Sequence, residues 1–347
     1  MNGAKKYVAW CTALLVVSLL TGPIAYATDI QTVIIGNPGN AGELSGVGVS
    51  GGYGPDRVCG AVNYVYAIGK FETTAAQYTD FLNAVARTDT YGLFNQSMFS
   101  DSYGCHIQRS GTAGNYTYSV AADWADRPVN YVNWGDAARF TNWLHNGQPT
   151  GAQDLTTTED GSYYLNGART MNELLSVTRE PDATWVIPSE DEWYKAAYHC
   201  NDGATGNYHR YPTGSDDVPN NGNPEGDTGN SANYYDGDHT IGAPYWRTDA
   251  GYFSLSGSPY ATFDQGGNVW EWNEAVLTGS QGTVRGLRGG SYIDIPNDFL
   301  NAACRFDYGR PTHDSMDSGF RVALVPEPGS LLLLTVCIVI RLSRALP

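Results

Sequence analysis

The spacing of apolar residues predicts only short secondary-structure elements in this chain. Val62, Tyr64 and Tyr66 alternate with other residues within segment 61–72, a pattern typical of a β-strand. The Gly-rich segment 36–54 before it shows no such period and is predicted to be a loop. The strand is therefore expected to follow a long irregular connection.

Two amphipathic helices are predicted in the first half of the chain. Thr74 and Gln77 have the spacing of a capping box, so the first helix should begin directly after Thr74. The second should span about residues 134–145, with Gly147 where a helix stop belongs. Their expected inward faces are Tyr78, Phe81, Leu82 and Val85 in the first helix and Ala137, Phe140 and Leu144 in the second.

A third short helix is predicted after Ser189, which has Glu192 three residues on as its capping partner. Its expected inward face consists of Trp193, Ala196, Ala197 and Cys200. Residues 202–252 follow, dense in Asn, Asp, Gly and Tyr and without clear periodicity. A stretch of this length needs something to hold it, and Ca²⁺ is one candidate because it prefers hard oxygen ligands.

The two ends of the chain are predicted to be targeting segments. Lys5 and Lys6 precede an apolar run over residues 7–20, and the small residues around Ala27 favour a secretory signal peptide, residues 1–27, cleaved after Ala27. A short membrane anchor is the alternative.

At the other end, Val325-Pro326-Glu327-Pro328 leads into the apolar run 329–340, which is closed by Arg341 and Arg344. A helix of that length rises about 18 Å, too short for a permanent span of the hydrocarbon core. Residues 325–347 resemble the PEP-CTERM sorting signal of Gram-negative bacteria. That resemblance implies export, transient membrane contact and processing by an exosortase-type protease.

Composition narrows the class of protein. The chain has 347 residues, with 36 acidic and 20 basic ones and a formal net charge of −16, so a nucleic-acid partner is disfavoured. It contains 41 Gly, 17 Pro, 24 Tyr and 9 Trp. This combination favours loops fixed by aromatic side chains over a helical bundle or a disordered chain.

Six cysteines occur, of which four lie in the expected exported body: Cys59, Cys105, Cys200 and Cys304. One or two disulfides could form in an oxidising compartment, and the sequence does not choose among the three possible pairings. A buried free thiol remains open for each cysteine. Cys304 is expected to be structural.

Six sequence blocks resemble the formylglycine-generating enzyme family, the sulfatase-modifying factors. The blocks are Glu72–Tyr78, Pro128–Ala137, Ile187–Trp193, Gly267–Trp272, Leu287–Ser291 and Gly319–Val322. The resemblance implies a single irregular α+β domain over residues 28–324, rich in loops, low in regular secondary structure and related to C-type lectin-like folds.

The Gly-Gly turn between Asp264 and Glu271 can direct two carboxylates and backbone carbonyls at one point, as a hard cation requires. The family resemblance implies two structural calcium sites, with ordinary turn hydrogen bonds as the alternative. The implied ligands are Asp264, Gly267, Val269 and Glu271 for the first site and Asn233, Tyr234, Asp249 and Gly251 for the second, the Gly, Val and Tyr residues acting through their carbonyls. Trp270 and Trp272 are expected in the core. Arg285, Arg288 and Arg321 are expected to pair with structural carboxylates.

The family's founding enzymes bind Cu(I) through two cysteines after the Arg-Gly-Gly-Ser block and oxidise a substrate cysteine. Here those positions align with Asp294 and Phe299. Soft thiolates select Cu(I), whereas a carboxylate is a hard ligand and a phenyl ring does not replace a thiolate. Bound copper and formylglycine-generating activity are therefore not expected, although Ser291 is retained.

The leading hypothesis is a noncatalytic module at the cell envelope, outer surface or exopolysaccharide matrix that binds a polysaccharide or a surface protein. Its expected ligand residues are Ser291, Tyr292 and Asp294. One alternative is an enzyme of the same family with copper-free chemistry. The other is a purely structural matrix protein.

Overall fold

The computed structural model describes residues 27–222, 226–279, 282–294 and 299–326. The predicted signal peptide up to residue 26 and the predicted sorting tail from residue 327 lie outside these residues. The strands are β1 (Thr32–Ile35), β2 (Glu43–Ser45), β3 (Arg57–Cys59), β4 (Tyr66–Gly69), β5 (Gln108–Ser110), β6 (Thr117–Ser119), β7 (Trp185–Val186), β8 (Trp270–Gly279), β9 (Gly282–Arg288), β10 (Phe306–Gly309), β11 (Ser318–Gly319) and β12 (Ala323–Leu324). The helices are α1 (Ala75–Val85), α2 (Ser97–Ser100), α3 (Ala122–Ala125), α4 (Trp134–His145), α5 (Met171–Ser176) and α6 (Glu190–Tyr198).

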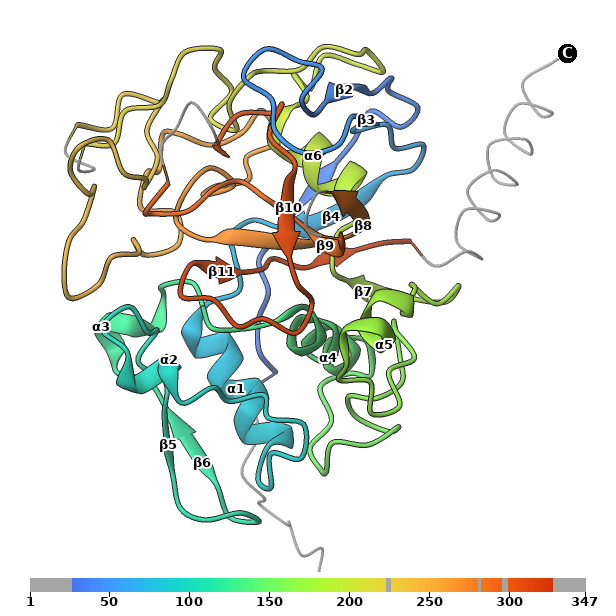
Figure 1. The fold of residues 1–347 in the computed structure, drawn as a ribbon, viewed down its shortest axis with the longest axis vertical. Coiled ribbons are helices and arrows are strands. Elements are labelled where there is room, and N and C mark those ends of the chain that lie inside the picture. The colour runs from blue at the N-terminus through green and yellow to red at the C-terminus, as the bar shows by residue number, and fades with distance from the viewer. Residues whose placement is uncertain (1–26, 223–225, 280–281, 295–298, 327–347) are drawn as a thin grey trace, which may run out of the picture.

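Two four-stranded sheets lie at the centre of the molecule (Figure 1), and their strand orders are β1-β4-β12-β7 and β10-β9-β8-β11. β8 and β9 form the longest hairpin, in which Glu271 lies opposite Arg288 and Gly279 opposite Gly282. Helices α1 to α5 and the β5–β6 hairpin occupy the lower half of Figure 1, and long loops occupy the upper half. This arrangement is the predicted loop-rich α+β architecture.

The three predicted helices are present, and α1 and α6 begin after the capping residues that the sequence indicated, Thr74 and Ser189. In α1, Gln77 N donates to Thr74 Oγ1 at 3.3 Å, and Gln77 Oε1 accepts from Thr74 N at 2.9 Å. α4 has the predicted bounds, and Gly147 follows it with a φ of +79°. The prediction was wrong for Cys200, because α6 ends at Tyr198 and the chain continues as extended backbone.

The predicted strand 61–72 is shorter than expected, since only β4 is extended and paired. Its first part bonds to a loop instead of a sheet: Val62 O accepts from Gly39 N, and Val62 N donates to the Asn40 side chain. Segment 36–54 is mostly a loop as predicted, but it contains β2, which pairs with β3.

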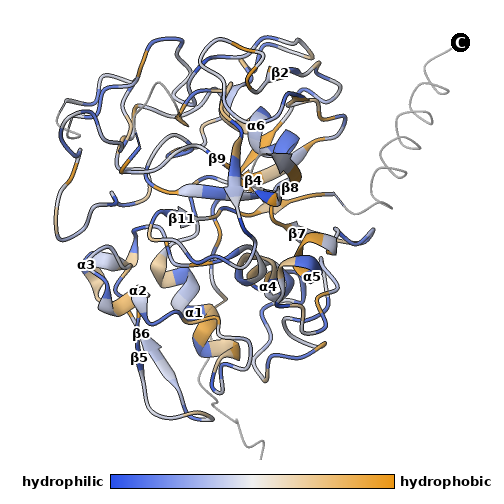
Figure 2. Ribbon diagram, in the orientation of Figure 1, coloured by the Kyte–Doolittle hydropathy of each residue, from blue (hydrophilic) through white to orange (hydrophobic). Residues whose placement is uncertain are grey.

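Aromatic side chains from α1, α4 and the sheets form the centre of the core. Phe81 and Phe140 lie 5.3 Å apart between ring centroids, as do Phe140 and Phe320. Figure 2 shows hydrophobic and polar residues side by side on α1, as expected for a helix with one buried face. Trp270 and Trp272 are buried, which confirms that they belong to the core.

Buried arginines join distant parts of the chain. Arg288 pairs with Glu190 at 2.8 Å and Arg321 pairs with Glu271 at 2.6 Å, which confirms both expected ion pairs. The expectation was wrong for Arg285, whose guanidinium donates to the carbonyls of Glu274, Leu174 and Val177 and stacks on a Trp134 ring.

The polar stretch from residue 202 to 252 contains no α-helix or multi-residue strand among its described residues. Isolated bridges hold it, for example Asn220 with Ser231 and Asn233 with Gly267. Cys59, Cys105 and Cys200 are free thiols. Among all the residues that the structure describes, no helix has the length and apolar character needed to span a membrane.

Candidate functional site

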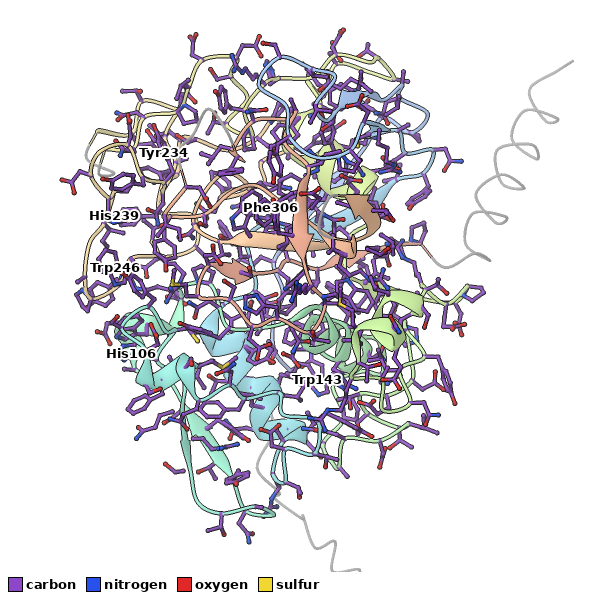
Figure 3. The ribbon with its side chains drawn as sticks, viewed as in Figure 1. His106, Trp143, Tyr234, His239, Trp246 and Phe306 are labelled. Atoms are coloured by element: carbon purple, nitrogen blue, oxygen red, sulfur yellow. The ribbon has the colours of Figure 1, made fainter. Side chains whose placement is uncertain are left out.

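Four partly exposed aromatic residues form a row on the loop-rich side of the molecule: Tyr235, His239, Trp246 and Tyr103. Ring centroids are 4.9 Å apart between Tyr235 and His239, 4.9 Å between His239 and Trp246, and 5.0 Å between Trp246 and Tyr103. Figure 3 shows His239 and Trp246 one above the other at the edge of the molecule. These four residues are called the aromatic row below.

The predicted ligand residues Tyr292 and Asp294 adjoin the aromatic row. The ring of buried Tyr292 stacks 6.2 Å from that of Tyr103, and the Tyr292 carbonyl lies 3.3 Å from His239 Nδ1. The backbone N–H of Tyr235 donates to the carbonyl of Asp294 at 3.0 Å. Residues 292–294 therefore contact three of the four residues of the aromatic row: Tyr103, His239 and Tyr235.

Ser291 completes this turn through the side chain of Asp294. The Ser291 hydroxyl donates to Asp294 Oδ2 at 2.6 Å. Burial raises the pKa of Asp294 to about 6, the Ser291 hydrogen bond opposes the shift, and the nearby charge of Asp317 reinforces it. The structure thus joins all three sequence-predicted ligand residues in one turn, whose backbone contacts the aromatic row and whose Asp294 carboxyl is largely buried.

The two positions that align with copper cysteines cannot form a thiolate site. Asp294 is engaged with Ser291, and Phe299 packs against Tyr53, Trp270 and Phe306 at 5.9, 5.5 and 5.8 Å between ring centroids. The phenyl ring therefore extends the aromatic core. These side chains do not fit the soft coordination that Cu(I) requires.

In the first predicted calcium set, the carboxylates of Glu271 and Asp264 already have hydrogen-bond partners within the protein. Glu271 Oε2 accepts from Arg321 at 2.6 Å and from Trp193 Nε1 at 2.7 Å, and its Oε1 accepts from Arg321 at 2.7 Å. Asp264, at a φ of +61°, accepts from the N–H of Gly251 at 2.6 Å. Gly251 belongs to the second predicted set, so this hydrogen bond connects the two.

The second predicted set is joined to the first through Asn233 as well. Asn233 bridges to Gly267, while its buried Oδ1 has no hydrogen-bond partner. Asp249 lies 3.4 Å from the Arg127 guanidinium and is half exposed. Tyr234 donates its hydroxyl to the carbonyl of Pro219.

Sequence reasoning missed Asn268, which ties these sets to the rest of the site. Its Oδ1 accepts from Asn233 Nδ2 and from the N–H of Thr248, both at 3.0 Å, and its carbonyl accepts from Tyr292 N at 3.1 Å. Its Nδ2 donates to Glu72 Oε1 at 3.1 Å. Asn268 has a φ of +62°, which Asn adopts more readily than most residues. An Asn directly after two glycines is the signal in the sequence that could have drawn attention to it.

Glu72 was also missed as a candidate site residue. It is 2% exposed, and its Oε2 has no hydrogen-bond partner. Burial, together with the charges of Asp264 and Glu271, raises its pKa well above the usual range of a glutamate. A cavity of about 400 Å³, lined by Glu72, Asp126 and Asp249, adjoins this cluster.

One feature of these contacts favours a calcium ion and another opposes it. Glu72, Asp264 and Glu271 carry three carboxyl groups against one guanidinium, Arg321, and the unpartnered Glu72 oxygen suits a hard cation. Within the described residues, no three His, Cys, Asp or Glu side chains come together as a ready metal cluster. A cation here would therefore need amide and backbone oxygens, the donor types that both predicted sets contain.

Arg247 supports the aromatic row and was not identified from the sequence either. It is fully buried and donates to the carbonyls of Tyr103 at 2.6 Å and Gly104 at 2.9 Å. Its guanidinium also lies 5.8 Å from the centroid of the Tyr292 ring. Tyr103 and Gly104 lie more than 140 residues before Arg247 in the chain, so no local pattern predicts these hydrogen bonds.

Comparison with known proteins bears on this site. Residues 58–325 match the sulfatase-modifying factor enzyme 1-like domain. The crystal structure of CarF is similar, with 20% sequence identity, a TM-score of 0.52 and coverage of 86% of this chain and 100% of CarF. The variable protein 1 of Treponema denticola matches at 19% identity and a TM-score of 0.51, over 87% of this chain and 97% of that protein. No curated protein matches the chain.

The two structural likenesses concern the fold alone, whereas the family match covers most of the chain. It includes the capping block of α1, the turn around Asn268 and the Ser291–Asp294 turn. The chain therefore belongs to the family of sulfatase-modifying factor enzyme 1-like domains.

Proposed function

We propose that this family member is an exported, noncatalytic module that binds a glycan at the aromatic row, beside the 291–294 turn. The proposal is carried by the two side chains at the positions that align with the copper-binding cysteines: Asp294 accepts a hydrogen bond from Ser291, and Phe299 packs into the core. These positions therefore lack the thiol pair of the founding enzymes. The aromatic row lies next to Asp294, at the first of them.

The chemistry of this surface suits a neutral sugar chain. Aromatic rings offer flat apolar faces on which a sugar ring can stack, and the polar atoms of His239 and Tyr235 within the row can exchange hydrogen bonds with hydroxyl groups. The acidic chain should repel strongly anionic polysaccharides. The predicted signal peptide and sorting tail support a role at the cell envelope, outer surface or extracellular polysaccharide matrix of a Gram-negative bacterium, after processing by an exosortase-type protease.

A glycan array with neutral and acidic oligosaccharides tests the binding proposal. Trp246→Ala should weaken binding to a neutral hit at least tenfold, since it removes the ring between His239 and Tyr103. Tyr164→Ala is the matched control, because Tyr164 is 51% exposed and lies outside the row. Isothermal titration would give the two affinities.

An array without any hit, for a protein shown to be folded, would contradict glycan binding and favour a purely structural matrix protein. Equal loss of affinity in Trp246→Ala and Tyr164→Ala would contradict the proposed position of the site. A surface protein as ligand would appear as binding to whole cells that survives removal of their polysaccharide.

The second candidate function is a copper-free enzyme of the same family. The raised pKa of Asp294, about 6, is the observation that favours it, because a carboxyl group near neutrality can transfer protons. Turnover of a cysteine-containing sulfatase peptide by the copper-free protein, or stoichiometric iron in the purified protein, would support this candidate over a noncatalytic module. The binding proposal expects neither result.

We also propose that a structural Ca²⁺ is held where the two predicted sets meet, with Glu72 as an additional carboxylate. A divalent cation would replace the proton that the raised pKa of Glu72 favours, would balance the charge of Asp264 and Glu271, and would bind the unpartnered Glu72 oxygen. It would stabilise the long loops of the 202–252 segment through ligands far apart in the chain.

Chelation by EGTA should therefore lower the melting temperature by several degrees at neutral pH, and added Ca²⁺ should restore it. Glu72→Gln should reduce this response, whereas Glu180→Gln, outside the cluster, should leave it unchanged. Differential scanning calorimetry measures all three proteins. A melting temperature that does not respond to EGTA would contradict the calcium sites.

A further inference from the structure

Thr28, the residue directly after the predicted cleavage position, occupies a specific site in the fold. It is 8% exposed, although the neighbouring Ala27 and Asp29 are exposed. Its backbone nitrogen donates to Gln148 Oε1 at 2.6 Å, and its carbonyl accepts from Gln148 Nε2 at 2.9 Å. The Thr28 hydroxyl donates to Asp80 Oδ2 at 3.1 Å.

The groups that surround Thr28 come from α1 and from the segment directly after α4. Asp80 lies on α1, and Gln148, with a φ of +60°, follows the end of α4. Gln77 of α1 fixes the next residue, because its side-chain amide donates to the carbonyl of Asp29 at 2.8 Å. β1 begins at Thr32 and pairs with β4, so the contacts of Thr28 connect this sheet edge to the helical half.

Cleavage before Thr28 would change the chemistry of this site. A signal peptidase adds water across the Ala27–Thr28 peptide bond: the C–N bond breaks, Ala27 keeps the new carboxylate and Thr28 keeps the amine. At neutral pH the amine takes up a proton, because a free α-amino group has a pKa near 8. One amide donor thus becomes a cation with three N–H donors, next to an amide oxygen and a carboxylate.

We infer that Asp80 and Gln148 form a binding site for the mature N-terminus, in which the Thr28 ammonium pairs with the Asp80 carboxylate. The Gln148 side chain accepts from the Thr28 nitrogen and donates to the Thr28 carbonyl. Removal of the signal peptide would then fasten β1 to α1 and α4 as the exported protein matures. This inference rests on cleavage after Ala27 and is independent of any glycan binding at the aromatic row.

Three forms of the otherwise complete exported body test the inference: one that begins at Thr28, one that begins at Ala27, and the Thr28 form with an acetylated N-terminus. Acetylation keeps an amide donor and removes the charge. The free Thr28 form should melt about 1–3 °C above the other two, as one added partly exposed ion pair allows. Amides of β1 should also exchange more slowly with deuterium in that form.

The advantage of the free Thr28 form should disappear in Asp80→Asn and persist in Asp182→Asn, which removes an exposed carboxylate elsewhere. Equal melting and equal β1 exchange in the three forms would overturn the inference. So would mass spectrometry of the secreted protein that places its first residue anywhere other than Thr28. Glycan affinity should be the same in Asp80→Asn and in the parent protein, so failure of either proposal can be recognised separately.

Discussion

At the scale of single residues, Asp294 shows how one substitution alters the chemistry that this fold can support. The family's founding enzymes have a copper-binding thiol at the aligned position, whereas here a carboxyl group accepts a hydrogen bond from Ser291. Because the carboxyl is largely buried and close to Asp317, its protonated form is favoured in the folded protein.

The raised pKa of Asp294 has a defined effect on stability. Its folded pKa of about 6 exceeds the ordinary value of 3.8, so the folded state binds the proton more tightly than the unfolded state. This contribution is complete below about pH 4 and is lost as the pH rises through 6. Asp294→Asn should therefore be more stable than the parent at pH 7.5, by roughly 1–3 kcal/mol, with little difference at pH 4.

Urea unfolding of the two proteins across this pH range measures the difference. A constant difference between pH 4 and 7.5 would show that another feature of the substitution, and not titration of the carboxyl, changes the stability. Asp182→Asn is a suitable control, because this exposed aspartate lies in a different part of the molecule.

At the scale of elements, four helices begin with the same reciprocal contact. α1, α4, α5 and α6 each have a capping box, in which the residue before the helix and the third helical residue satisfy each other's backbone N–H groups. Helices this short gain little from propensity alone, so caps and packing decide where they begin. This locality explains why the starts of α1 and α6 could be predicted from their capping residues in the sequence.

The strands behave differently, because their extent depends on partners elsewhere in the chain. β4 covers only Tyr66–Gly69, where β1 and β12 offer backbone groups on either side. The alternation of apolar residues begins earlier, at Val62, but the backbone of Val62 bonds to the loop at Gly39. An alternating pattern therefore indicated a buried face without fixing the length of the strand.

At the scale of the whole molecule, buried ion pairs connect elements that are distant in sequence. Glu190, at the start of α6, accepts from Arg288 on β9 at 2.8 Å, from Arg305 at 2.7 Å and from Arg57 on β3 at 2.9 Å. Burial alone would raise the pKa of Glu190, but the surrounding guanidinium groups lower it to about 2. One carboxylate thus connects the start of α6 with β3, β9 and Arg305.

Glu190→Gln should lower the free energy of unfolding at pH 7 by roughly 3–5 kcal/mol, because it leaves buried guanidinium groups without their counter-charge. The lowered pKa gives the sign of the pH dependence: the stabilisation is present above about pH 4.5 and is lost as the pH falls towards 2. Urea unfolding at pH 7 and pH 3 tests both points, with Glu180→Gln as the control. A loss below 1 kcal/mol at pH 7 would contradict the role of this cluster.

The sequence by itself determined the family, the loop-rich α+β class, the helix starts and the absence of paired thiols at Asp294 and Phe299. These features depend on residue identity or on contacts within a few positions, and short motifs encode them directly. Ser291, Tyr292 and Asp294 could be proposed together because Ser291 ends the Leu287–Ser291 block and the other two follow it within three residues.

Only the tertiary structure decided what surrounds that turn. Tyr103 meets Trp246 and Arg247 across more than 140 residues, and Glu72 meets Asn268 across 196. Such contacts arise because the long loops of the upper half fold back onto the sheets, and nothing local in the sequence sets their path. The aromatic row and the surroundings of Glu72 depend on this return of the chain, and the site around Thr28 depends on the packing of α1 beside the end of α4. All three could therefore be seen only in the folded molecule.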